Sequence, residues 1–102
     1  MLFEPPQYNR KVLFHIYNST LSLVSKLQKN QVLTEREEED LENIPSTLMI
    51  CYLNGFAEAK EKLIDAKPLL KQHKNPVVYI NFKEVMRILR KVKYNTETPK
   101  TT

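Results

Sequence analysis

Glycine is almost missing from this sequence. Gly55 is the single glycine among 102 residues, whereas an average protein contains about 7% glycine. Because glycine supplies the positive-φ positions of tight hairpins, its scarcity argues against a fold of strands and short turns. It also excludes a glycine-rich phosphate loop. The length suits one domain with a small core.

Cysteine and long apolar runs are equally scarce. The lone Cys51 has no second cysteine for an internal disulfide, which fits a reducing compartment. No apolar run approaches the roughly 20 residues that a membrane span needs. The segment Met1–Pro6 lacks the basic region and apolar stretch of a signal peptide. We therefore expect an intracellular, cytoplasmic protein that does not contact a membrane.

Residues that would carry chemistry do not form a recognisable site. No two of His15, His73 and Cys51 fall at metal-ligand spacing on one helical face. Cys51 lies in an apolar stretch, where burial would raise its thiol pKa and leave it unreactive. Carboxylates pair only in the segment 35–42, without burial or a partner to tune them for acid–base catalysis. We expect no enzyme activity, no catalytic or metal-binding residue, no cofactor and no small-molecule substrate.

Charge is sorted along the chain. Residues 1–33 carry four cations and one acid, residues 34–66 carry three cations and nine acids, and residues 67–102 carry nine cations and two acids. Six of the acids lie in the segment 35–42, and five of the cations lie in 82–93. Segregation on this scale creates local fields that act on binding partners more than on the fold.

The spacing of apolar residues predicts an all-α fold. Helices are expected over 9–29, 35–43 and 46–67, followed by a last helix to about Lys93. We predict a compact antiparallel helical bundle of three main helices plus one short acidic helix. It would form a single domain over 9–94, between an N-terminal extension of residues 1–8 and a disordered tail of residues 95–102.

Local signals set the helix ends. Asn9 suits an N-cap, and Thr34 followed by Glu37 matches the capping box. Gly55 falls inside the third helix, where it would mark a close helix crossing or a local bend. The segment 77–80 has strand-like composition, so the last helix begins either at Asn81 or as early as Pro76.

Apolar positions on the main helices predict the core. The residues expected there are Leu13, Ile16, Tyr17, Leu21, Val24, Met49, Leu53, Phe56, Leu63, Phe82, Val85 and Leu89.

The last helix offers the candidate working surface. Lys83, Arg87, Arg90 and Lys91 follow helical spacing on the side opposite the apolar stripe. Met86 and Ile88 lie off that stripe and leave apolar surface for a second contact. The acids Glu37, Glu38 and Glu39 supply the opposite charge.

These features predict a non-enzymatic protein-interaction module, such as an adaptor, inhibitor or regulator, that binds another macromolecule or associates with itself. A homodimer would pair the acidic helix of one copy with the basic helix of the other. The alternative is sequence-independent nucleic-acid binding through Lys83, Arg87, Arg90 and Lys91. Short, basic, all-helical chains include phage and mobile-element regulators, but this likeness of size and composition places no site.

Overall fold

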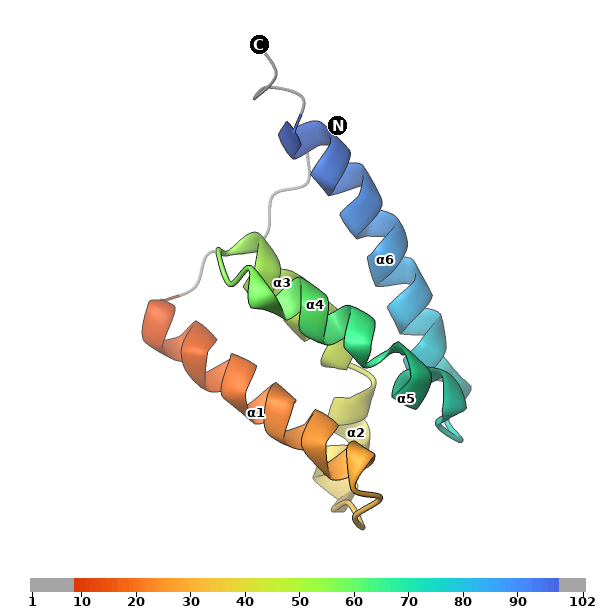
Figure 1. The fold of residues 1–102 in the computed structure, drawn as a ribbon. Helices are drawn as coiled ribbons and strands as arrows, with labels where there is room; N and C mark the ends of the chain where they lie inside the picture. The colour runs from red at the N-terminus through yellow and green to blue at the C-terminus, as the bar shows by residue number, and fades with distance from the viewer. Residues whose placement is uncertain (1–8, 98–102) are drawn as a thin grey trace.

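The chain folds into α-helices joined by short connections. The computed structural model describes residues 9–97, with side chains described as far as Lys91, and contains no strand in this part. The helices are α1 (Arg10–Gln28), α2 (Glu35–Leu41), α3 (Ile44–Leu53), α4 (Glu58–Asp65), α5 (Lys67–Gln72) and α6 (Pro76–Glu97) (Figure 1). The all-α prediction is confirmed.

The first two helices start where capping residues satisfy their free backbone N–H groups. The side chain of Asn9 accepts a hydrogen bond of 2.8 Å from the Lys11 N–H. Thr34 and Glu37 form the predicted capping box, with the Glu37 N–H 3.1 Å from Thr34 Oγ1 and the Thr34 N–H 2.9 Å from Glu37 Oε1. Both predicted N-termini are confirmed.

The single helix predicted over 46–67 is wrong. The chain breaks between α3 and α4, and Gly55 takes a φ of +107° there. Only glycine adopts that backbone angle without steric cost, so its position fixes the break. Pro45 lies in the first turn of α3, and Pro68 lies in the first turn of α5, where a missing N–H costs nothing.

The segment 77–80 is helical and belongs to α6, which begins at Pro76. Asn75, rather than Asn81, caps this helix: its Oδ1 accepts a hydrogen bond of 3.0 Å from the Val77 N–H. At the other end α6 continues to Glu97 and includes residues 95–97, which we expected to belong to the tail. Residues 1–8 and 98–102 lie outside the described part.

Helix α3 occupies the centre of the fold. It contacts α1, α4 and α6, and it lies with α4 between α1 and α6 in Figure 1. Its apolar residues surround the whole helix, as expected of an element covered on several sides. No helix in the described part is long and apolar enough to cross a membrane.

The predicted core is confirmed at seven positions and incomplete elsewhere. Leu13, Tyr17, Met49, Leu63, Phe82, Val85 and Leu89 are buried. Ile16, Leu21, Val24, Leu53 and Phe56 are half-buried instead. The buried residues that we did not predict come mostly from α3 and the short helices: Leu23, Leu41, Ile44, Pro45, Leu48, Cys51, Ala59, Ala66, Leu70 and Val78.

Candidate interaction surfaces

Helix α6 presents a mixed apolar and basic face to solvent. Val78, Phe82, Val85 and Leu89 are buried along one side of the helix. The described side chains exposed on its other side form what we call the outer face of α6: Val77, Ile80, Lys83, Glu84, Arg87, Arg90 and Lys91. All four predicted basic residues therefore share one exposed surface, on which four cations face one acid.

Glu84 and Arg87 form the one ion pair on the outer face among the described residues. Arg87 Nε donates a hydrogen bond of 3.1 Å to Glu84 Oε2, and Arg87 Nη2 donates to Glu84 Oε1. This hydrogen bonding lowers the pKa of the Glu84 carboxyl and raises the pKa of the Arg87 guanidinium. Within the described part, no ion pair joins Lys83, Arg90 or Lys91 to a carboxylate.

A half-buried aromatic ring connects the outer face of α6 to α5. The ammonium groups of Lys71 and Lys83 lie 6.0 and 5.2 Å from the centroid of the Tyr79 ring, which stacks on Phe82. Such distances allow cation–π attraction. The basic surface therefore continues from α6 onto α5, and residues 67–91 carry seven cations against one acid.

The apolar residues exposed on this surface are not Met86 and Ile88, the two that we predicted from the sequence. Met86 and Ile88 are half-buried and pack against the core. Up to Lys91, the exposed apolar side chains of α6 are Ile80 and Val77, with exposed fractions of 55% and 40%. We did not predict either residue as part of the site, because the sequence left the conformation of residues 77–80 open. Only a helix that begins at Pro76 places Ile80 on the same side as the cations.

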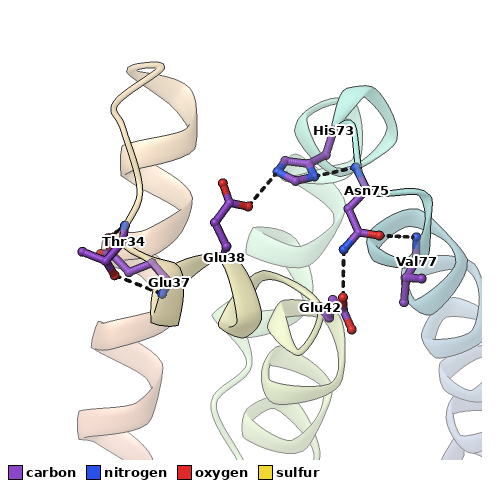
Figure 2. Close-up of polar contacts among 7 residues, drawn as sticks. All are labelled: Thr34, Glu37, Glu38, Glu42, His73, Asn75 and Val77. Atoms are coloured by element: carbon purple, nitrogen blue, oxygen red, sulfur yellow. Dashed lines mark hydrogen bonds and ion pairs between the residues drawn. The ribbon is translucent and has the colours of Figure 1, made fainter.

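Much of the acidic helix α2 is engaged within the chain. Glu37 forms an ion pair with Lys26 of α1. It also completes the capping box with Thr34, as Figure 2 shows. The hydrogen bonds from Lys26 and from the Thr34 backbone lower the pKa of the Glu37 carboxyl. Glu38 Oε2 lies 3.8 Å from His73 Nε2. Glu39 is exposed.

Glu42, the residue that follows α2, makes the polar contacts described between this end of α2 and the beginning of α6. Asn75 Nδ2 donates a hydrogen bond of 2.8 Å to Glu42 Oε2 (Figure 2). Asn81 Nδ2 donates one of 2.8 Å to the Glu42 carbonyl oxygen. Arg87 follows Asn81 by six residues, or about 9 Å along the helix axis. The acids of α2 therefore form no ion pair with the outer face of α6 among the described residues.

A hollow surface separates α1 from α2. Two adjoining depressions of about 250 and 450 Å³ share His15, Ser19, Leu23 and Asp40, and we call them together the α1–α2 groove. The groove is completed by Ile16, Asn18, Thr20, Ser22, Glu37, Asn43, Ile44 and Thr47. Its lining combines carboxylates and hydroxyls with apolar side chains, and sequence reasoning missed it because it joins residues from three helices.

The described residues assemble no recognisable catalytic or metal centre. Cys51 is fully buried, and burial raises the pKa of its thiol, which disfavours the nucleophilic thiolate. No group of three or more His, Cys, Asp and Glu side chains in the described part is placed to hold a metal ion.

Comparison with known proteins gives a family. The profile of a family described as "Domain of unknown function (DUF5929)" matches residues 1–95. No curated protein and no solved structure matches the chain.

Proposed function

We propose that this chain, which belongs to the DUF5929 family, is a non-enzymatic module that binds another protein through the outer face of α6. The observation that carries the proposal is the exposure of Ile80, at 55%, beside the cations Lys83 and Arg87. Exposed apolar surface bordered by charge is typical of protein interfaces.

Apolar and charged residues would have separate roles in this contact. Ile80 and Val77 supply apolar area, which stabilises a complex when water leaves it. Lys83, Arg87, Arg90 and Lys91 raise the rate of encounter with an acidic surface and select its orientation. The expected partner is therefore an acidic protein surface with an apolar centre. A regulatory role in the cytoplasm fits this chemistry.

Sequence-independent nucleic-acid binding is the second candidate. The observation that favours it is the distance of α2 from Arg87, since the acids of α2 leave the outer face of α6 unneutralised. Contact with four to six phosphates would give a salt slope of roughly −4 to −5. Two features favour protein instead: Glu84 would be repelled by phosphates, and Ile80 would have no apolar partner on a phosphate backbone.

Photocrosslinking tests which macromolecule covers this face. A photoreactive amino acid replaces Ile80 in the full chain, and a control variant carries it at Glu61, which is exposed on α4. After irradiation in cells of the native host, adducts are treated with nuclease or protease and identified by mass spectrometry. We expect a protein adduct from position 80 and none from position 61.

Two outcomes would contradict the proposal. Adducts of equal yield from positions 80 and 61 would mean that the outer face of α6 is not the contact surface. A nuclease-sensitive adduct from position 80 would favour the second candidate. That candidate also predicts that anisotropy of labelled random duplex or single strand reports micromolar binding at 50 mM salt, weakened by roughly 250- to 1,000-fold at 200 mM.

A further inference from the structure

We infer that the outer face of α6 docks into the α1–α2 groove of a second copy of this chain. The inference rests on the proposed function and names the partner. Each copy carries both halves of the contact, a basic face with an exposed apolar residue and an acidic groove with apolar lining. Their charges are opposite, and they lie on separate elements of the fold.

The groove provides acids that remain available to a partner. Asp40 lines both depressions, is exposed, and forms no ion pair among the described residues. A shallow hollow at the same edge adds Glu35 and Glu39, with Arg36 as its one cation. Hydroxyls of Ser19 and Thr47 line the groove and offer further hydrogen-bond acceptors to an ammonium or guanidinium group.

The apolar parts of the two surfaces also match. Ile16 is half-buried and lines the groove beside its polar groups, together with the largely buried Leu23 and Ile44. Ile80 projects from the outer face of α6 with more than half of its surface exposed. Burial of Ile80 against this lining would add hydrophobic stabilisation to a contact that charge alone would leave weak.

The spacing of the cations suits an extended contact. Lys83, Arg87 and Lys91 follow one another at four-residue intervals, which places their Cα atoms about 6 Å apart along one side of the helix. Arg87 is already oriented by Glu84. A carboxylate such as Asp40 would extend this pair into a network, which contributes more than an isolated exposed ion pair.

No ion pair among the described residues joins the two surfaces within one copy. Glu42, directly after α2, is hydrogen-bonded to Asn75, directly before α6, and to Asn81 within α6. Arg87 and Lys91 lie further along that helix. Opposite charges that remain apart within a molecule attract between molecules, provided that salt does not screen them.

Charge exchange between the two surfaces tests the inference. Sedimentation velocity on the full chain, from low to high micromolar concentration at 50 mM salt, should show association that declines at 1 M salt, where the Debye length falls to about 3 Å. Arg87→Glu with Lys91→Glu, or Glu39→Lys with Asp40→Lys, should each weaken association by about tenfold or more. An equimolar mixture of the two variants should associate again, as should one chain that carries all four substitutions.

Matched controls separate this contact from a general effect of net charge. Lys11→Glu with Lys62→Glu changes the charge as the first variant does, and Glu58→Lys with Glu61→Lys changes it as the second does. All four control positions are exposed, and none of them lines the α1–α2 groove or belongs to the outer face of α6. Controls should associate like the wild type, and circular dichroism should show every variant folded.

The inference is overturned if the wild type stays monomeric, if the charge-reversed variants associate unchanged, or if their mixture does not recover. These failures are distinguishable from failure of the proposed function. A monomeric wild type that still gives an adduct with a different protein from position 80 retains the interaction module and rejects the second copy as its partner.

Discussion

Single residues at the junction of α1 and α2 perform more than one task, and Glu37 is the clearest case. Its carboxylate accepts the Thr34 N–H of the capping box and pairs with Lys26 on the preceding helix. The sequence predicted the first contact, because the capping box is a local four-residue pattern. It could not predict the second, because Lys26 becomes a neighbour only after the chain reverses between α1 and α2.

Glu37→Gln should destabilise the protein at neutral pH, and the difference from wild type should shrink in acid. The pKa of Glu37 is lowered from its ordinary value of 4.5, first by the Lys26 hydrogen bond and then by that of the Thr34 backbone. Because the pKa is lowered in the folded state, the ionised carboxylate stabilises the fold above pH 4.5. This contribution disappears as the pH falls through the lowered pKa. Urea unfolding of wild type and variant at pH 7 and pH 3 measures it.

The matched control is Glu35→Gln, which removes an acid from the same first turn of α2 without breaking these hydrogen bonds. A difference between Glu37→Gln and wild type that persists unchanged at pH 3 would contradict the role assigned to the ionised carboxylate.

At the scale of elements, Gly55 decides where the third predicted helix divides. Apolar periodicity over 46–67 favoured one helix, and a glycine inside a helix costs only about 1 kcal/mol, so periodicity alone could not place a break. The structure places Gly55 at a φ of +107°, and the break allows α4 to turn back against α3. Residues 77–80 have strand-like composition but are part of helix α6, because the tertiary packing of Val78 and Phe82 overrides local propensity.

Gly55→Ala should therefore lower the free energy of unfolding by about 1 to 3 kcal/mol, the usual cost of holding a non-glycine residue in a strained backbone conformation. An added Cβ would approach Arg10 Nη1 at 3.4 Å, and that flexible side chain has room to move. The cost is thus expected from the backbone angle rather than from a clash.

Denaturant unfolding of Gly55→Ala, beside Gly55→Asn, measures this cost. Asparagine enters positive φ more readily than alanine, so Gly55→Asn should lose less stability. Equal losses in the two variants, or none in Gly55→Ala, would show that positive φ at this position does not constrain the fold.

At the scale of the whole molecule, the position of the acidic segment relative to the basic side of α6 decides whether that side is free to bind. The sequence alone located the basic side of α6, because four cations at helical spacing must share a face. It could not say whether the acidic segment covers that face. That answer depends on Asn75 and Asn81, whose bonds to Glu42 hold α2 at the beginning of α6. The α1–α2 groove was equally out of reach, since His15 and Asp40 become neighbours only in the folded chain.

The central position of α3 predicts which core residues contribute most to the stability of the whole molecule. Leu48 lies on α3, which contacts α1, α4 and α6, and its exposed fraction is 0%. Leu48→Ala should cost about 2 to 5 kcal/mol through lost burial and the cavity that remains, a large part of the roughly 5 to 15 kcal/mol of a typical domain. Val32→Ala, at a side chain that is 97% exposed, should change stability by less than about 0.5 kcal/mol.

Because α3 connects α1 with α6, the effect of Leu48→Ala should reach both of these helices. Hydrogen exchange should accelerate in α1 and α6 together, and urea unfolding followed by circular dichroism and by tyrosine fluorescence should give one shared transition. Faster exchange confined to α3 would mean instead that the outer helices are stable without it, and that the two proposed contact surfaces belong to separately folding parts.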